Sequence, residues 1–382
     1  MPMPTVPSTP GIAKFSRRAI LLSLPGAALL AQEEPQDQWD KIARVVAVGD
    51  VHGDCDAFVK TLQMAGLLDS HADWSGGPAH LVQLGDVPGR GPQTRQALEL
   101  LMKLEKQAAD AGGRAHALIG NHDAMPMYGD MRNLTPEEYA EFAASNSEEL
   151  RDQAWQEELA SRPPSAGGAP TEADLETYRQ RWLQEHPPGF IELRRAFAPD
   201  GAYGSWIRSH NTVLRINETL FVHGGISPAM LPFSISKINR TIRAELLSPS
   251  KFEGLTPQLD GPLWYRGLAE DDERKLSPHV NAVLKTFRVR RIVIGHTVTR
   301  AAILPRFGSR VVNIDLGLSR FYGRPPACLV IDEQGTRVLH AGTSIPLPGP
   351  EPGQRRQYLR AVAEADPEPA VSQKVMNDLQ AR

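Results

Sequence analysis

Five short clusters of glycine and polar residues carry the side chains best suited to metal and phosphate chemistry. Their candidate ligands bind through oxygen or nitrogen and include no thiolate, a set that suits Mn²⁺, Fe or Zn²⁺ better than a soft metal. If one ligand is shared, each of two metals can receive three or four protein contacts and keep positions open for water. The clusters therefore predict a dinuclear hydrolytic centre with the ligands Asp50, His52, Asp86, Asn121, His223 and His296.

This prediction depends on the joint occurrence of the residues. A single Asp or His after a strand is usually a turn former or a satisfied surface group, so each cluster alone is weak evidence. Asp50 and His52 alternate along an extended chain, so both side chains can point to the same side. The neighbouring glycines allow the backbone to approach a metal closely.

Each polar cluster follows a short apolar run that predicts a buried strand. Continuous apolar runs of this length, bounded by glycine, are typical of strands covered on both faces. Helical patterns at 57–68 and 95–109 lie between the earlier runs, and this alternation indicates an α/β layered fold. Ligands of such folds bind outside the carboxyl ends of the strands, so the clusters should converge on one rim. The runs occupy 43–48, 80–84, 115–119, 220–222 and 291–294.

The predicted catalytic domain, 43–345, contains a segment of different composition at about 136–198. This segment is rich in Glu, Gln, Ala and Arg, and it predicts two or three amphipathic helices inserted between core strands. We expect the insertion to lie over the active site, and the alternative is a solvated elaboration without a role in the chemistry. Residues 32–42 are predicted to form a linker, and residues 346–382 a C-terminal tail or peripheral helix.

Residues 1–31 have the pattern of an export signal. Arg17 and Arg18 precede an apolar run, 19–31, that is too short to span a bilayer but suits the hydrophobic region of a signal peptide. Paired arginines before such a run resemble a bacterial twin-arginine signal, whose translocon carries folded proteins. The sequence thus predicts a periplasmic protein that meets the membrane only through this signal, and a disordered basic tail is the alternative.

Charge and cysteine content exclude several classes of function. The chain has 42 basic and 45 acidic side chains, and its formal charge of −3 gives no long-range attraction to a polyanion. No nucleic-acid partner is therefore expected. The two cysteines, Cys55 and Cys328, are too few for a disulfide scaffold or a thiolate zinc site, although one disulfide between them stays open.

The order of the motifs resembles the calcineurin-type metallophosphoesterases, and in particular their phosphoprotein phosphatase branch. The motifs are Gly-Asp-x-His-Gly, Gly-Asp-x-x-x-Arg-Gly, Gly-Asn-His-Asp, His-Gly-Gly and Gly-His-Thr. Three further stretches, 120–134, 261–267 and 313–317, resemble the bacterial and plant Shewanella-like protein phosphatases more closely than the eukaryotic serine/threonine enzymes. The resemblance extends over about 43–335 and implies a layered β-sandwich flanked by helices.

The resemblance also implies a role for each motif residue. Asp50 and His52 would hold one metal, Asn121, His223 and His296 the other, and Asp86 would bridge them. Arg90 and Arg266 would bind the phosphoryl oxygens, for which the guanidinium fork is geometrically suited, with Asn121 beside them in the substrate site. His122 would protonate the leaving oxygen, as histidine commonly does near neutral pH.

The predicted function is that of a dinuclear-metal phosphomonoesterase acting on phosphorylated Tyr, Ser or Thr side chains, or on a small phosphoester. Two divalent ions, Mn²⁺ in preference to Fe or Zn²⁺, would make a bridging water largely hydroxide, and this hydroxide would attack phosphorus directly. The alternatives are a nucleotide or dinucleoside polyphosphate hydrolase, a phosphodiesterase, and a metal-dependent binding protein. An aromatic-lined pocket would favour phosphotyrosine, and the candidates to line it, which core packing can also explain, are Tyr128, Trp206, Trp264 and Tyr265.

One position departs from the family pattern. Gly89 stands where the related phosphatases have an aspartate that pairs with the general-acid histidine. His122 would need another carboxylate, with Asp123 or Asp54 as candidates, or the enzyme would favour good leaving groups such as aryl phosphates. On this interpretation, Gly89→Asp is expected to raise turnover on alkyl phosphates more than on aryl phosphates.

Overall fold

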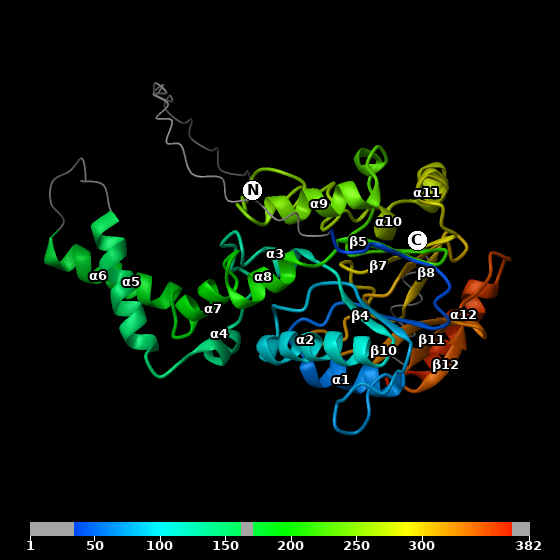
Figure 1. Cartoon of the computed structure of the whole chain (residues 1–382), viewed down its shortest axis with the longest axis horizontal. Coiled ribbons are helices and arrows are strands. Elements are labelled where there is room, and N and C mark those ends of the chain that lie inside the picture. Colours follow the sequence, from blue (N-terminus) through cyan, green and yellow to red (C-terminus); the bar gives the residue numbers. More distant parts are fainter. Residues whose placement is uncertain (1–33, 162–170, 369–382) are drawn as a thin grey trace, which may run out of the picture. The chain divides into compact units, whose positions relative to one another are not determined.

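The computed structural model describes residues 34–161 and 171–368. The predicted export signal, 1–31, lies outside the described residues, as do the Pro/Gly-rich part of the insertion and the chain from residue 369 onward. In the described part, two mixed six-stranded sheets form the centre of the fold (Figure 1).

The first sheet holds three of the predicted strands side by side. Its order is β12 (Thr343–Pro346), β11 (Gly335–His340), β10 (Ala327–Asp332), β2 (Val45–Val48), β3 (His80–Gln83) and β4 (Arg114–Ala117). β2, β3 and β4 run parallel, so that Val46 lies opposite Leu81 and Leu81 lies opposite Ala115. The carboxyl ends of these three strands therefore reach the same edge of the sheet.

The second sheet holds the other two predicted strands. Its order is β1 (Gln38–Trp39), β5 (Val213–Ile216), β6 (Thr219–Val222), β7 (Arg291–Ile294), β9 (Val311–Asn313) and β8 (Leu304–Arg306). β6, β7 and β9 are parallel neighbours, with Val222 opposite Ile294 and Ile294 opposite Asn313. A strand is thus present at each of the five apolar runs of the sequence.

Alternate residues of each strand enter different hydrophobic cores. Val45 and Ala47 of β2 lie in the core between the two sheets, whereas Val46 and Val48 face the core under α1 (Cys55–Met64) and α2 (Thr94–Asp110). In β6, Phe221 enters the same central core. Its neighbours on β6 face a third core under α9 (Ile235–Glu245) and α11 (Glu273–Phe287). This period of two gives four layers and confirms the predicted α/β sandwich flanked by helices.

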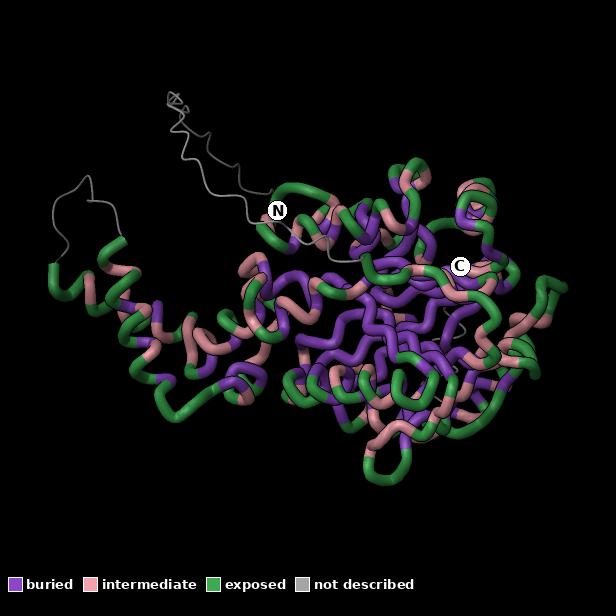
Figure 2. Tube along the Cα trace, viewed as in Figure 1, coloured by how far each residue is buried: buried purple, intermediate pink, exposed green. Residues whose placement is uncertain are grey.

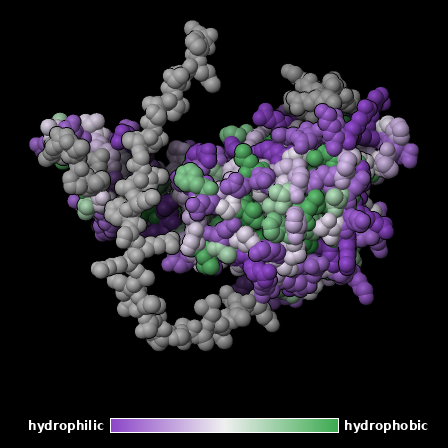
Figure 3. All heavy atoms as spheres, turned by 90° about the horizontal axis from the view of Figure 1, so that it is seen from above, coloured by the Kyte–Doolittle hydropathy of each residue, from purple (hydrophilic) through white to green (hydrophobic). Residues whose placement is uncertain are grey.

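The figures show the same layers. α1 and α2 lie on one side of the sheets and α9 and α11 on the other (Figure 1). The buried residues are concentrated between them (Figure 2). On the face seen in Figure 3, apolar residues gather in the middle and hydrophilic residues surround them. Shorter helices connect the layers, namely α3 (Asn121–Ala124), α8 (Ala202–Arg208), η1 (Pro228–Met230) and α10 (Gly267–Glu270).

The described part of the predicted insertion, 136–161 and 171–198, contains four helices where two or three were predicted. They are α4 (Pro136–Phe142), α5 (Ser147–Ser161), α6 (Glu172–Glu185) and α7 (Phe190–Ala196). α5 and α6 bury few side chains, among them Trp155 and Trp182, whose rings lie 5.5 Å apart. The two seven-residue helices, α4 and α7, give only a weak signal in the sequence, because such short helices complete only two turns of the apolar period.

The ends of the described chain are better packed than predicted. β1 falls within the predicted linker and pairs in parallel with β5. In the predicted tail, α12 (Gln354–Ala365) buries Tyr358, Leu359 and Val362, and the Tyr358 hydroxyl donates to the carbonyl of Ile303 at 2.7 Å. Among residues 34–161 and 171–368, no helix has the length and apolar character needed to cross a membrane.

Candidate active site

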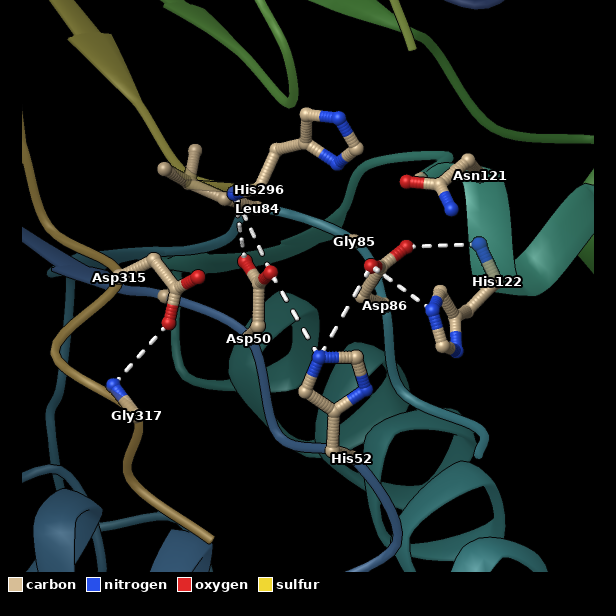
Figure 4. A network of polar contacts seen from close by, with 12 residues as sticks. Asp50, His52, Leu84, Gly85, Asp86, Asn121, His122, His296, Asp315 and Gly317 are labelled. Atoms are coloured by element: carbon tan, nitrogen blue, oxygen red, sulfur yellow. Dashed lines mark hydrogen bonds and ion pairs between the residues drawn. The ribbon is translucent and has the colours of Figure 1, made fainter. Parts of the chain in front are cut away.

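The predicted ligands converge where the parallel strands end. Asp50 and His52 follow β2, Asp86 follows β3, and Asn121 begins α3 after β4. His223 follows β6, and His296 follows β7 of the other sheet. The structure brings all six together, each with an exposed fraction of 6% or less. Figure 4 labels five of them, all except His223.

Asp86 takes part in two groups of candidate metal ligands. One group joins it to His52 and His122, and the other joins it to His223 and His296; in each group, one donor atom per residue lies within 4.8 Å of the others. Asp86 Oδ2 lies 4.0 Å from His52 Nε2, and its Oδ1 lies 3.2 Å from His223 Nε2. The two oxygens of one carboxylate thus face different groups, which is the arrangement a bridging ligand needs.

The remaining predicted ligands border these groups. Asn121 Oδ1 lies 3.0 Å from His223 Nε2. Asp50 Oδ2 lies 3.9 Å from His52 Nε2 and also accepts the backbone N–H of His296 at 3.1 Å. His122 was predicted as an acid rather than a ligand, yet its Nε2 lies 3.9 Å from Asp86 Oδ2.

The backbone at these residues is strained. His52, Asp86 and His296 have φ of 48°, 54° and 66°, a left-handed conformation that costs a non-glycine residue about 1–3 kcal/mol. The N–H of His52 donates to the carbonyl of Asp86 at 3.0 Å and helps to hold this turn. Gly120 is required beside it, since a Cβ there would lie 2.3 Å from Asp86 Oδ1. Such strain is often found where a fold positions functional side chains.

The electrostatics of the site fit cations. Burial lowers the pKa of His52 to about 3 and that of His296 to about 2, so both imidazoles are neutral and offer lone pairs. Burial and the neighbouring Asp315 and Asp86 raise the pKa of Asp50. His296 Nε2 is buried without a hydrogen-bond partner in the described structure. Crowded carboxylates and unpaired imidazole nitrogens are the donor set that divalent metals use, and the residues therefore fit two metal ions.

Asp315 and Asn133 are among the site residues that the sequence interpretation missed. Asp315 follows β9 and is buried beside Asp50; burial raises its pKa to about 6, and its Oδ1 accepts the N–H of Gly317 at 3.0 Å. Asp315 follows the end of a strand, and the same position in the sequence identified the six candidate ligands. Asn133 has no such signal, because it lies in the loop before the insertion.

A cavity of 310 Å³ opens over the candidate ligands, between the two predicted arginines. Arg90 has a buried Nε without a hydrogen-bond partner in the described structure, and its guanidinium lies 5.2 Å from the ring of Phe321. Arg266 donates from Nη1 to the His296 carbonyl and to Thr297 Oγ1, both at 3.0 Å. The described helices of the insertion contribute no residue to the lining of this cavity.

In the described part of the chain, neither Asp123 nor Asp54 pairs with the ring of His122, whose Nε2 lies 3.9 Å from Oδ2 of Asp86. Asp123 instead accepts the backbone N–H groups of Asp86 and Gly120 at 2.8 and 2.7 Å, and Asp54 caps α1 by accepting the N–H of Ala57 at 3.0 Å. Asp123 and Asp54, the two carboxylates that could have replaced the aspartate absent at position 89, therefore bond to backbone amides and not to the ring of His122.

Neutral groups replace the carboxylate at His122. Asn133 Nδ2 lies 3.2 Å from His122 Nε2. The pKa of His122 is lowered by burial, while Asp86 and a hydrogen bond to the carbonyl of Pro88 oppose this effect. An amide NH₂ group can only donate, so Asn133 bonds to Nε2 while that nitrogen carries no proton, and unlike a paired carboxylate it does not stabilise the protonated imidazole.

The surroundings of Gly89 reverse the expectation for its substitution. Gly89 has φ of +90°, and a Cβ there would lie 2.5 Å from His122 Nδ1. We expect both Gly89→Ala and Gly89→Asp to displace His122 and to lower kcat on alkyl and aryl phosphates by roughly 10- to 100-fold, since misplacement by about 1 Å can cost that much.

Steady-state kinetics with both substrate types would check this expectation. Gly112→Ala is the matched control, because Gly112 has φ of +76° but a Cβ there meets no atom within 4 Å. It carries the backbone strain without the clash. Higher turnover of Gly89→Asp on alkyl phosphates would contradict this account and support the earlier expectation.

The aromatic lining differs from the predicted set. Trp264 lines the cavity as predicted, and Tyr322, which was not predicted, lines it too. Tyr128 lines a separate cavity, the Trp206 indole donates to Glu105 at 2.8 Å, and the Tyr265 ring lies 6.4 Å from that of His279.

Both cysteines, Cys55 and Cys328, are buried and free, so the disulfide left open by the sequence does not form.

Comparisons with known proteins agree with this geometry. Residues 43–300 match the profile of the calcineurin-like phosphoesterases. Shewanella-like protein phosphatase 2 of Arabidopsis thaliana is 28% identical over 330 residues, covering 82% of this chain and 80% of that protein. An uncharacterized protein of Schizosaccharomyces pombe is 30% identical over 302 residues, covering 76% and 78%. The crystal structure of a cold-active protein-tyrosine phosphatase of a psychrophilic Shewanella sp. has a TM-score of 0.62 and 28% identity, covering 81% of this chain and 82% of that one. The chain therefore belongs to the calcineurin-like phosphoesterase family, as the order of its motifs predicts.

Proposed function

We propose that this metal-dependent phosphatase is a dinuclear phosphomonoesterase that acts on phosphorylated protein side chains and prefers phosphotyrosine. The observation that carries the proposal is the position of Asp86, whose two oxygens face two groups of buried donors. Arg90 and Arg266 line the cavity above them. A phosphoryl group is the substrate that needs both cations and guanidinium groups.

The ligands would hold two divalent ions, Mn²⁺ in preference to Fe or Zn²⁺, because the donors are oxygen and nitrogen atoms without a thiolate. When bound, such ions activate water as the nucleophile and neutralise charge on the phosphoryl oxygens. Arg90 and Arg266 bind the same oxygens and orient the phosphoryl group for in-line displacement. His122 Nε2, on the cavity side beside Asn133, delivers a proton to the leaving oxygen.

Aromatic side chains at the cavity support a preference for phosphotyrosine. Trp264 and Tyr322 line the cavity, and Phe321, which is 59% exposed, packs against Arg90, a residue of the lining. The phenyl ring of phosphotyrosine holds its phosphate farther from the peptide backbone than serine does, and it can pack on these rings. The solved Shewanella structure is also named a protein-tyrosine phosphatase.

A groove beside the cavity supports a polypeptide substrate. Its volume is 1150 Å³, and it shares Thr297, Val298 and Arg300 with the cavity that holds the candidate ligands. A peptide whose phosphorylated side chain enters the cavity has room in this groove for its neighbouring residues. A small phosphoester would leave it empty.

A panel of phosphotyrosine, phosphoserine and phosphothreonine peptides, assayed with Mn²⁺, tests the proposal. We expect the highest kcat/KM on phosphotyrosine peptides. Phe321→Ala should lower that value roughly two- to tenfold and spare phosphoserine, because an aromatic contact contributes about 0.5–1.5 kcal/mol. Phe252→Ala is the control, because Phe252 is 83% exposed and the Arg90 guanidinium packs on Phe321 instead.

Two other substrate classes belong in the same panel. A dinucleoside polyphosphate with a higher kcat/KM than every phosphopeptide would replace the protein-substrate assignment. Preferential hydrolysis of bis-p-nitrophenyl phosphate would replace it with a phosphodiesterase. Absence of activity on all of these substrates, in protein that binds Mn²⁺, would leave a metal-dependent binding protein.

We also propose export to the periplasm through residues 1–31. The support is the pair Arg17 and Arg18 before a short apolar run. Export in the folded state would allow the metals to be loaded before the membrane is crossed. Replacement of both arginines by lysine, followed by fractionation of the producing cells, tests the proposal, and an unchanged distribution would refute it.

A further inference from the structure

Glu138, at the start of the insertion, has a carboxylate in an unusual environment. Its side chain is 0% exposed, although glutamate is rarely fully buried unless its carboxylate has polar partners. Oε1 accepts the backbone N–H of Gly89 at 2.8 Å and the hydroxyl of Thr94, and Oε2 accepts the N–H of Thr135 at 3.0 Å. Glu138 thus links α4 to the loop that carries Arg90.

The contact reaches the part of that loop next to the cavity. The N–H of Arg90 donates to the carbonyl of Asn133 at 3.0 Å, so two consecutive amides bond to the segment that opens the insertion. Gly89 has φ of +90°, which glycine adopts readily, whereas Arg90 has φ of +71°, a conformation that a non-glycine residue keeps only where its surroundings fix it. Arg90 Nε has no hydrogen-bond partner in the described structure, so the direction of the guanidinium depends on this backbone and on the rings of Phe321 and Tyr322, 5.2 and 5.8 Å away.

Helix capping alone does not account for these contacts. Glu138 and Thr135 form a capping box, in which Thr135 Oγ accepts the N–H of Glu138 at 3.3 Å and Oε2 returns a bond to Thr135. The cap uses Oε2 only. Oε1 serves Gly89 and Thr94, which belong to the loop before α2 and to α2 itself. The two roles lie on different oxygens, so substitutions can separate them.

We infer that Glu138 is a positioning residue, which holds the Gly89–Arg90 turn so that Arg90 points into the cavity and binds the phosphoryl group. The inference rests on the proposed phosphomonoesterase function. It assigns the start of the insertion a role in the chemistry, although the described helices of the insertion contribute no residue to the cavity lining. Position 89 lacks the aspartate of the related phosphatases, and the carboxylate of Glu138, from α4, bonds to the backbone of the same turn.

The test compares Glu138→Ala, Glu138→Gln and Thr135→Ala in Mn²⁺-loaded full-length protein. Glu138→Ala removes both roles, Glu138→Gln keeps the Oε1 acceptor, and Thr135→Ala weakens only the cap. We expect Glu138→Ala to raise KM for p-nitrophenyl phosphate and Ki for inorganic phosphate about tenfold, because a displaced arginine binds both more weakly. Glu138→Gln should stay within about threefold of wild type, and Thr135→Ala should lower Tm without changing either constant.

A double-mutant cycle with Arg90→Ala shows whether the effect passes through that arginine. Glu138→Ala should add little to KM in the Arg90→Ala background, since coupled residues are not additive. An unchanged KM in Glu138→Ala, or an equally large effect without Arg90, would overturn the inference. If Glu138→Ala does not fold, Glu138→Leu fills the same volume and allows the same comparison. Inactive wild-type protein would instead refute the proposed function.

Discussion

Replacing Asp86 with asparagine is expected to lower kcat/KM on every phosphoester by at least about 10³-fold, or roughly 4 kcal/mol of transition-state stabilisation. One Asp86 oxygen faces His52 and the other faces His223. Asparagine keeps the size of the side chain but replaces one acceptor oxygen by an NH₂ group and removes the charge. One group of donors therefore loses its carboxylate oxygen, and the other keeps only a neutral amide oxygen.

Metal content and activity should fall together in this variant. Elemental analysis of wild-type protein is expected to give two divalent ions per chain, and Asp86→Asn should bind fewer. Asp110→Asn is the matched control, because Asp110 is an exposed aspartate at the end of α2. A variant that keeps both ions and full activity would show that Asp86 bridges nothing, and the dinuclear assignment would fail.

The local pattern of the sequence was enough to predict that the six candidate ligands lie together and that the fold is α/β, whereas the sandwich was implied by the family resemblance. Each ligand follows an apolar run directly, and parallel strands carry such residues to one edge of a sheet. Val45 and Val46 show why the layers were predictable, since neighbouring residues of a strand enter different cores. In both cases the information lies within a few residues of the position concerned.

The partners of the site residues could not be predicted in this way, because they come from distant segments. The ring of His122 contacts Asn133, which lies in a loop and follows no strand, so no motif near His122 marks this partner. Glu138 bonds to Gly89 across 49 positions of the chain, and in the sequence it has only the pattern of a helix-capping residue. The departure at Gly89 was visible, but its consequence required the 2.5 Å approach of a Cβ to His122.

The effect of removing His122 is expected to depend on the leaving group. His122→Asn should lower kcat/KM on phosphoserine peptides by about 10²–10³-fold, within the range of general acid catalysis, because an alkoxide leaves poorly without a proton. A phenolate leaves more easily, so the loss on phosphotyrosine peptides should be about tenfold or less. Burial lowers the pKa of His122, which already limits the fraction that is protonated and favours aryl esters in the wild-type enzyme.

A series of substituted phenyl phosphates measures this dependence directly. The variant should show a steeper dependence of kcat/KM on leaving-group pKa than wild type does. Asparagine at the exposed His71 is the control. His122 also belongs to a group of candidate ligands with His52 and Asp86, so the metal content of the variant must be measured alongside. An equal loss on all substrates together with loss of one ion would make His122 a ligand, whereas a leaving-group-dependent loss with both ions retained identifies it as the proton donor.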